Sequence, residues 1–176
     1  MTTTNLKKLK RLSPMELSYI AGFLDGDGSI YAQIIKRPDY RLRFQIRVCI
    51  GFSQKTTRHW FLIQLINQLQ YGSLRKNPDN GMSDYTIVGE EAVKHCLEAL
   101  RPHLKMKKRQ AALLLQIIEQ SQKKEEPDAF LTRCELVDQV SRFNDTKNRK
   151  ITSNTVRSLF LELNLLSVPV ETQSGD

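Results

Sequence analysis

The chain has 176 residues, 40% of them hydrophobic, and this length suits one domain with a substantial core. Lysine and arginine number 27 against 19 acidic residues, so the formal net charge is +8 and a polyanionic partner is favoured. No apolar run approaches about 18 residues, which excludes a membrane-spanning segment and gives no reason to expect a membrane partner.

The three cysteines, Cys49, Cys96 and Cys134, are odd in number and lie far apart in the chain. Their spacing matches no zinc site and predicts free thiols, which points to an intracellular, reducing compartment. The basic stretch 7–11 lacks the apolar core of a signal peptide. We interpret it as a basic arm, with a weak transit segment as the alternative.

The first predicted element is a helix that follows Ser13 and ends at the glycines 26 and 28. Ser13 and Glu16 have the spacing of a capping box, and Pro14 suits the first helical position. Apolar residues three and four apart predict its buried face: Leu17, Ile20 and Leu24. The helix therefore directs its C-terminal end at whatever lies beyond residue 28.

A neighbouring face of this helix carries small side chains, which allow a second backbone to approach closely. We predict that it forms a dimer interface through Ser18, Ala21, Gly22 and Asp25. Asp25 has a second interpretation, as a group that caps or braces the helix.

Two carboxylates, Asp25 and Asp27, stand at the C-terminal end of the predicted helix. This end is the negative pole of the helix dipole, where a carboxylate is poorly placed unless a cation compensates it. One alternative is that both acids are turn formers in a glycine-rich loop. A calcium loop is excluded, because Ile30 and Lys36 stand where such a loop needs glycine and glutamate.

Two strands are predicted next, because apolar and other residues alternate over 30–35 and again over 41–52. The second stretch has an apolar face formed by Leu42, Phe44, Ile46, Val48, Ile50 and Phe52. Its opposite face carries Arg41, Arg43, Gln45, Arg47, Cys49 and Gly51, and no acidic residue occurs from 40 to 53. We interpret this face as one that lies on phosphates and base edges of DNA, with an ordinary solvated face as the alternative.

The remaining pattern predicts a helix from about Gln54 to Gly72, a hairpin of strands 73–77 and 83–88, and helices over 90–100, 109–119, 127–143 and 153–166. The fold class is therefore α+β, with an αββαββα core in which helices back an antiparallel sheet, followed by C-terminal helices. We expect a single domain over residues 1–166 and a disordered tail over 167–176.

The segment 20–28, Ile-Ala-Gly-Phe-Leu-Asp-Gly-Asp-Gly, closely resembles the LAGLIDADG motif, with conservative departures at Ile20, Phe23, Leu24 and Gly26. The family comprises homing endonucleases and some intron-splicing maturases. The resemblance covers nearly the whole chain and is closest to the homodimeric, single-motif endonucleases of algal chloroplast introns. The hairpin around 78–81 and the residues Arg37, Arg47, Gly51 and Asn77 depart from it, which leaves the target sequence open.

Hydrolysis of a phosphodiester by such a protein needs a metal that bridges the phosphate and activates water. Asp27, the Gly26 carbonyl and DNA phosphates form an adequate oxygen set for Mg²⁺, and Mn²⁺ is expected to substitute. The cationic run 105–109 is a candidate for charge stabilisation, with a solvated helix start as the alternative. The resemblance implies that Gln54 and Arg58 contact active-site water and phosphate, and that Lys107 is the active-site lysine.

The predicted DNA-contacting residues come from the strands, their connections and a C-terminal loop that the resemblance assigns to the DNA backbone. They are Tyr31, Gln33, Ile35, Arg37, Tyr40, Arg41, Arg43, Gln45, Arg47, Cys49, Arg75, Asn77, Asp84, Thr86, Lys147 and Lys150. Arginines favour guanine, and glutamine or asparagine favours adenine.

The resemblance implies a site-specific endonuclease that cuts a long, pseudo-palindromic double-stranded site as a homodimer, leaves short 3′ overhangs and works in the chloroplast. Two alternatives share the fold: a maturase that binds intron RNA, and a DNA-binding protein without cleavage activity.

Overall fold

A four-stranded antiparallel sheet organises the computed structural model, which describes residues 11–144 and 149–166. In chain order the elements are α2 (Pro14–Gly26), β1 (Gly28–Lys36), β2 (Phe44–Lys55), a 3₁₀ turn (Thr56–Arg58), α3 (His59–Leu69), β3 (Ser73–Asn77), β4 (Met82–Val88), α4 (Glu90–Leu100), a 3₁₀ turn (Arg101–His103), α5 (Lys108–Glu119), α6 (Pro127–Phe143) and α7 (Ser153–Glu162). This order confirms the predicted αββαββα core with C-terminal helices.

The strands are arranged in the order β1-β2-β4-β3, so the longest strand, β2, lies inside the sheet. Residues 28–36 of β1 pair with 44–52 of β2, and residues 49–55 of β2 pair with 82–88 of β4. Side chains that alternate along the sequence point to opposite faces of the sheet. Every second residue of β2 from Phe44 to Phe52 is buried, and so are the matching residues of β1. The opposite row of the sheet is polar.

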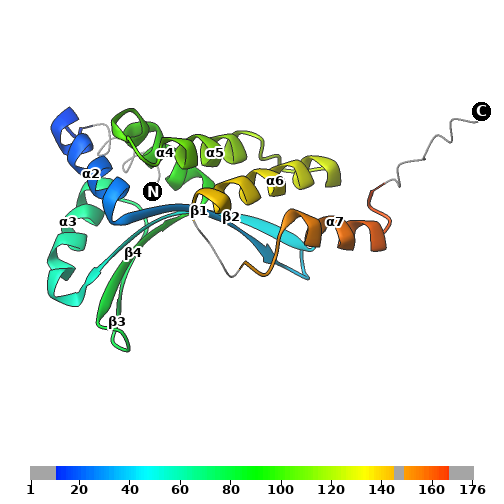
Figure 1. Cartoon of the computed structure of the whole chain (residues 1–176), viewed down its shortest axis with the longest axis horizontal. Helices are drawn as coiled ribbons and strands as arrows, with labels where there is room; N and C mark the ends of the chain where they lie inside the picture. The colour runs from blue at the N-terminus through cyan, green and yellow to red at the C-terminus, as the bar shows by residue number, and fades with distance from the viewer. Residues whose placement is uncertain (1–10, 145–148, 167–176) are drawn as a thin grey trace, which may run out of the picture.

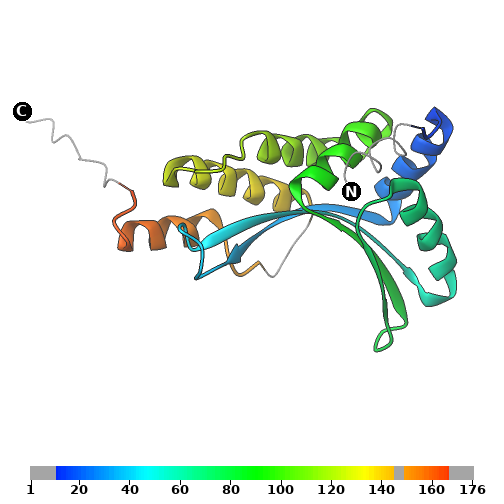
Figure 2. The same cartoon turned by 180° about the vertical axis from the view of Figure 1, so that it is seen from behind.

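Helices cover the apolar face of this sheet. Figures 1 and 2 show the sheet as an arch, with α4, α5 and α6 along its outer side and α2 and α3 together at one end. The apolar residues between these layers form one continuous core. At the α2 end, Phe23 stacks on Phe52 at 5.7 Å and meets the edge of Phe61 at 4.8 Å, which ties α2 and α3 to the strand between them.

The ends of α2 follow from its local sequence. Ser13 and Glu16 form the predicted capping box, in which the Glu16 carboxylate accepts from the Ser13 backbone N–H at 2.8 Å. After Gly26 the chain turns directly into β1. Gly28 permits this turn, because a Cβ there would lie 2.6 Å from a methyl carbon of Leu24 and 2.9 Å from its Cα.

Three predicted elements had wrong boundaries, and one of them is the last helix, which was expected to reach Leu166 and ends at Glu162. The second strand begins at Phe44, because Arg43 has a φ of +60° and its carbonyl accepts from the Arg37 N–H to close a turn. Gln54 and Lys55 remain in β2, and the helix that follows begins only at His59.

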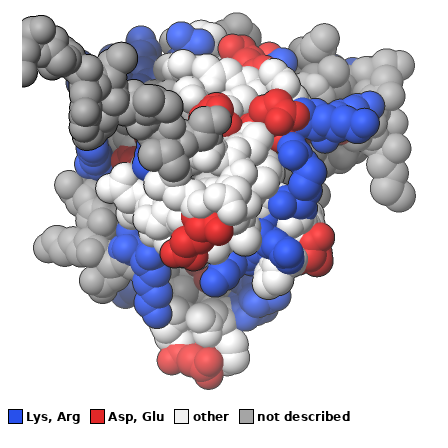
Figure 3. Space-filling model, turned by 90° about the vertical axis from the view of Figure 1, so that its right-hand side faces the viewer, with Lys and Arg blue, Asp and Glu red and all other residues white. Residues whose placement is uncertain are grey.

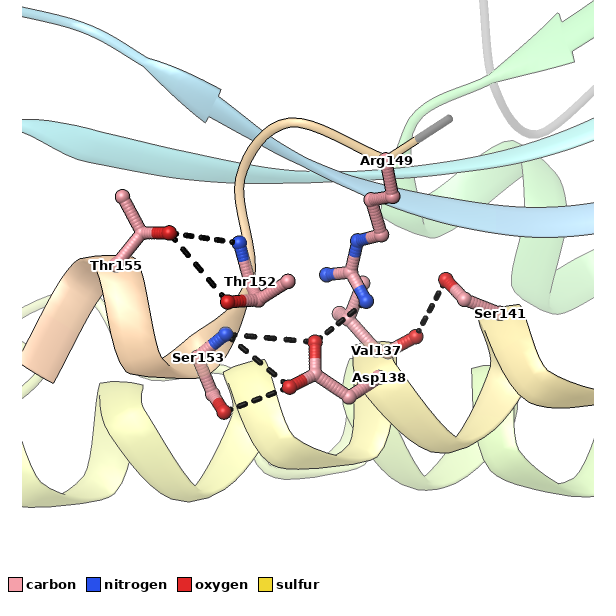
Figure 4. Close-up of polar contacts among 7 residues, drawn as sticks. All are labelled: Val137, Asp138, Ser141, Arg149, Thr152, Ser153 and Thr155. Atoms are coloured by element: carbon pink, nitrogen blue, oxygen red, sulfur yellow. Dashed lines mark hydrogen bonds and ion pairs between the residues drawn. The ribbon is translucent and has the colours of Figure 1, made fainter. Parts of the chain in front are cut away.

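Helix α7 is attached to α6 through Asp138, as Figure 4 shows. The Asp138 carboxylate accepts from the Ser153 backbone N–H at 3.1 Å and from its hydroxyl at 2.6 Å, and it pairs with Arg149 at 2.5 Å. One carboxylate thus caps the N-terminus of α7 and anchors the residues just before it.

The predicted tail, residues 167–176, lies outside the described residues. None of the described helices combines the length and the apolar character that a membrane crossing requires.

We expect the Asp138→Ala substitution to lower the free energy of unfolding by about 2 kcal/mol, because it removes a helix cap and leaves the partly buried Arg149 without its partner. Denaturant unfolding measures this. The matched control is Glu135→Ala on the same helix, whose pair with Arg157 is about half exposed, and it should cost less than about 0.5 kcal/mol. Equal losses in the two variants would contradict the anchoring role of Asp138.

Candidate nucleic-acid interface and active site

The exposed carboxylate of Asp27 is joined to two other predicted site residues by hydrogen bonds. The Gln54 amide donates to Asp27 Oδ2 at 2.9 Å, and the Arg58 guanidinium donates to Gln54 Oε1 at 3.0 Å. Gln54 stands in the inward-facing row of β2 and is buried, so the amide is fixed at the end of the apolar core. The structure thus brings together Asp27 at the end of α2, Gln54 of β2 and Arg58 of the 3₁₀ turn that follows β2.

Lys107 reaches the same end of α2. Its backbone N–H donates to Asp25 Oδ1 at 2.9 Å, and its ammonium group donates to the Asp25 backbone carbonyl. This carbonyl belongs to the last turn of α2, where cations interact favourably with the helix dipole. Lys107 therefore lies beside the helix end that carries Asp27.

The oxygen groups at this helix end fit a magnesium ion only in part. Asp27 offers an exposed carboxylate next to the carbonyl of Gly26, and hard oxygen ligands of this kind suit Mg²⁺. Among the described residues, no group of three or more histidine, cysteine, aspartate or glutamate side chains could hold a metal. The remaining ligands would therefore come from water, nucleic acid or a second chain.

The polar face of the sheet presents hydrogen-bonding side chains on all four strands. Gln33 is exposed on β1 and Gln45 and Arg47 are half-buried on β2, while Arg75 on β3 is exposed opposite Asp84 on β4. Ser53, Thr86 and Tyr31 complete this surface, and the Ser53 hydroxyl donates to Asp84 at 2.5 Å. Figure 3, which views the molecule from the α7 end, shows lysine and arginine side chains gathered along both of its lower flanks.

The turn between β1 and β2 places its arginines differently from the sequence prediction. Arg37 donates to Gln45 Oε1 at 3.2 Å and lies over the Tyr40 ring at 5.6 Å, so it belongs to the polar face. Arg41 donates to the carbonyl of Glu125 in the connection between α5 and α6, and Arg43 donates to the Pro38 carbonyl within the turn. The prediction that Arg41 and Arg43 extend the polar row of β2 was therefore wrong, and their contact with DNA stays a prediction.

Cys49 also departs from its predicted role. It stands on the polar side of β2, yet only 1% of it is exposed, and Tyr31 is its cross-strand neighbour. Burial raises the pKa of the Cys49 thiol, and burial likewise raises the pKa of Tyr31 to about 12. The prediction that Cys49 contacts DNA is corrected, because Tyr31 presents the surface at this point of the sheet. Neighbouring Gly51 is packed against Ser29 and Tyr31.

A groove of about 740 Å³ runs along the edge strand β1 toward the active-site end. Its lining includes Gln33, Lys36, Lys107 and Lys150, and none of the described residues that line it is acidic. Asn144, also in its lining, donates to the Ile30 carbonyl at 2.8 Å and ties the end of α6 to the strand. The groove therefore suits an anionic chain that passes from the sheet to Lys107. The predicted contact Lys147 lies outside the described residues.

The remaining predicted DNA contacts lie around this surface. Ile35 is half-buried near the end of β1, and Asn77 is half-buried at the end of β3, where its side chain accepts from the Asp79 N–H at 3.1 Å. Tyr40 is 43% exposed at the turn.

The predicted dimer face of α2 is only half free. Ser18 and Gly22 are exposed, and a Cβ at Gly22 would meet nothing within 4 Å. Ala21 and Asp25 are buried against the chain itself, so the prediction that these two residues form the interface was wrong.

Large apolar side chains around that face are exposed and were missed from the sequence. Met15 is 82% exposed and Tyr19 62% exposed on α2, Trp60 is 60% exposed on α3, and Met106 is 75% exposed next to Lys107. The spacing of Met15, Tyr19 and Gly22 at four and three residues is helical and could have indicated this stripe. Such a patch is typical of an interface rather than of a free surface.

Comparison with known proteins places these features in a family. Residues 20–111 match the LAGLIDADG endonuclease family model. The chain is 45% identical over 145 residues to DNA endonuclease I-CreI of Chlamydomonas reinhardtii, which covers 81% of this chain and 87% of that protein. It is 38% identical over 149 residues to DNA endonuclease I-CvuI of Chlorella vulgaris, and this alignment covers 85% of this chain and 92% of that protein.

Solved structures agree with this likeness. A crystal structure of the homing endonuclease I-CvuI, in complex with its target in the presence of calcium, superposes with a TM-score of 0.83 at 37% identity and covers 87% of this chain and 97% of that one. The archaeal intron-encoded homing endonuclease I-Vdi141I, complexed with DNA, has a TM-score of 0.76 over 86% of this chain and 98% of that one. At 18% identity, the archaeal match supports the fold alone.

We expect Tyr31→Ala to uncover Cys49, whose thiol is otherwise protected by burial and by its raised pKa. Labelling with a maleimide near neutral pH, followed by peptide mass spectrometry, should show Cys49 reacting faster by on the order of tenfold. Cys96 and Cys134 are fully buried and should stay unlabelled, and the control Tyr40→Ala should leave all three thiols protected. Fast labelling of Cys49 in the unaltered protein would refute its burial.

Proposed function

Because the chain belongs to the LAGLIDADG endonuclease family, we propose that it cleaves both strands of a DNA target site by metal-dependent phosphodiester hydrolysis, as a homodimer. The observation that carries the proposal is the chain of hydrogen bonds from Arg58 through Gln54 to the exposed Asp27. A carboxylate and a phosphate repel each other unless a cation lies between them. A protein that only binds DNA has no need of an acid held in this way.

The polar face of the sheet is suited to lie against one half of a DNA site. Strand β2 has 12 residues and spans about 40 Å at about 3.3 Å per residue. At about 3.4 Å per base pair this equals about one turn of the double helix, so a dimer would cover about two turns. Arg47 and Arg75 are suited to guanine edges, and Gln33 and Gln45 to adenine edges.

Three side chains prepare the reacting end of the site. Gln54 donates to one oxygen of Asp27 and so fixes the orientation of the carboxylate, and Arg58 holds the Gln54 amide through its oxygen. Lys107 supplies positive charge at the same helix end, where it would stabilise the negative charge that builds up on the phosphate during cleavage. Gln54 and Arg58 thus act through Asp27 and Lys107 acts on the phosphate, so none of these roles depends on the base sequence.

Asp27 and the carbonyl of Gly26 would hold Mg²⁺, with Mn²⁺ as a substitute. The ion, when bound, supplies a Lewis acid to the phosphate and lowers the pKa of an attacking water. Exposure of Asp27 at the negative pole of α2 supports this assignment, because a cation there relieves an unfavourable helix-dipole interaction.

Dimerisation through α2 is supported by the exposed stripe of Met15, Ser18, Tyr19 and Gly22, together with Met106. Each chain contributes one exposed carboxylate at the end of this helix. A two-fold pairing of the helices would place two such ends against the two DNA strands. The matching symmetry of the target would be pseudo-palindromic, and we propose that the staggered cuts leave short 3′ overhangs.

A reducing compartment is supported by the three cysteines, which are all free and buried. The resemblance to endonucleases of algal chloroplast introns favours the chloroplast as that compartment, and the two relatives are from Chlamydomonas reinhardtii and Chlorella vulgaris.

We expect Asp27→Asn to lower the rate of DNA cleavage in Mg²⁺ on the order of a thousandfold, because the metal loses its charged ligand. Specific DNA binding should persist, since the sheet is unchanged. A selection on a randomised DNA library identifies the target, with EDTA as the metal-free arm, and single-turnover cleavage then compares the variants. The control is Asp128→Asn, because Asp128 is exposed in the first turn of α6. Cleavage by Asp27→Asn at the parental rate would remove Asp27 from catalysis.

We expect Gly22→Glu to convert the protein from a dimer to a monomer. A Cβ at Gly22 would meet nothing within 4 Å, so the fold should survive, whereas two glutamates would repel across the paired helices. Sedimentation velocity measures the change, and circular dichroism checks the fold. The control Ser158→Glu lies on the exposed side of α7 and should stay dimeric. A dimeric Gly22→Glu variant would place the interface elsewhere.

A further inference from the structure

The first acid of the motif, Asp25, has different surroundings from the second. Its carboxylate accepts from three successive backbone N–H groups: Lys105 at 2.6 Å, Met106 at 3.2 Å and Lys107 at 2.9 Å. Asp25 is only 7% exposed, whereas Asp27 is exposed. Three converging amide groups form a typical anion-binding nest, and Asp25 fills this one from within the chain.

The nest stabilises the charged form of Asp25. Burial opposes ionisation of this carboxyl, but the three N–H donors outweigh it, so that the pKa of Asp25 lies below its ordinary value. Asp25 is therefore a permanent anion near neutral pH. Its charge also offsets the cations Lys105, Lys107 and Lys108, which otherwise stand unfavourably at the positive pole of α5.

Both ends of Lys107 are attached to Asp25. The Lys107 N–H binds the carboxylate, and the Lys107 ammonium binds the Asp25 backbone carbonyl. The side chain therefore lies across the last turn of α2. Lys107 is the N-cap position of α5 and the described residues provide no side-chain hydrogen bond that caps this helix, so Asp25 is the main tether of the segment.

We propose that Asp25 is a positioning residue for DNA cleavage, which holds the 105–107 segment by its three amides so that the Lys107 ammonium stays at the end of α2 that carries Asp27. This inference rests on the proposed function, because it assigns Lys107 a role in the reaction. The two acids of the motif then have separate tasks: Asp25 binds backbone donors and places a cation, and Asp27 faces the phosphate.

The test compares single-turnover cleavage by the full-length protein with three variants, Asp25→Asn, Lys107→Met and the double variant. Asn keeps the shape of Asp25 but loses its charge and one acceptor oxygen. We expect Asp25→Asn to slow cleavage about tenfold or more while DNA affinity, measured in Ca²⁺, stays unchanged. The Asp128→Asn control should cleave at the parental rate.

The double variant separates positioning from a general loss of structure. If Asp25 acts through Lys107, the double variant should cleave no more slowly than Lys107→Met alone. Rate losses that multiply in the double variant would overturn the proposal. A slow Lys107→Met beside a parental Asp25→Asn would also overturn it, while leaving the proposed endonuclease function intact.

A parental rate for Lys107→Met would remove Lys107 from the reaction and overturn the positioning role, and the Asp27 variant would then test the function separately.

Amide hydrogen exchange of the unaltered protein gives a readout that needs no variant. The N–H groups of Lys105 and Lys107 should exchange slowly, as hydrogen-bonded amides do. Exchange at the rate of an open loop would refute the tether even if Asp25→Asn failed to fold.

Discussion

The negative pole of α2 is the constraint that determines how the groups around Asp25 and Asp27 are arranged. Two carboxylates stand where the helix dipole disfavours negative charge, and each is compensated differently. Asp25 is compensated inside the chain by three backbone N–H groups from a segment eighty residues away in sequence. Among the described residues, Asp27 accepts from the neutral amide of Gln54 and forms no ion pair, which leaves its negative charge uncompensated within this part of the chain. This difference makes one acid structural and leaves the other available for chemistry.

If DNA lies on the polar face of the sheet, as proposed, the sheet fixes the position of this helix end relative to the DNA. Because side chains alternate along each strand, β2 can bury the row from Phe44 to Phe52 and present Gln45 and Arg47 on the opposite side. Gln54 continues the buried row beyond its apolar part and meets Asp27 there. Under the proposed function, base-contacting and catalytic groups would thus lie on one strand, and their separation would be set by backbone geometry.

Local pattern was enough to predict the elements but not their long-range contacts. Alternation predicted the strands and capping predicted α2, because each of these signals is contained within a few neighbouring residues. The turn at Arg43 escaped prediction because a positive φ at a non-glycine residue has no composition signal. The burial of Cys49 depends on Tyr31 across the strand pair, and the burial of Asp25 depends on residues 105–107. Neither is visible in a single stretch of sequence.

Under the proposed function, helix α2 would join dimerisation to catalysis, because one short element carries the exposed stripe and is followed directly by Asp27. Met15, Tyr19 and Gly22 lie on the stripe, and Asp27 follows it directly. Met106, also exposed, adjoins Lys107, so the candidate interface reaches the same site from a second segment. A chain that separates from its partner would uncover this apolar surface and would also leave a single acid at the DNA. Under the proposed pairing, the distance between the two reacting centres is set by helix packing, which allows less variation than a flexible linker would.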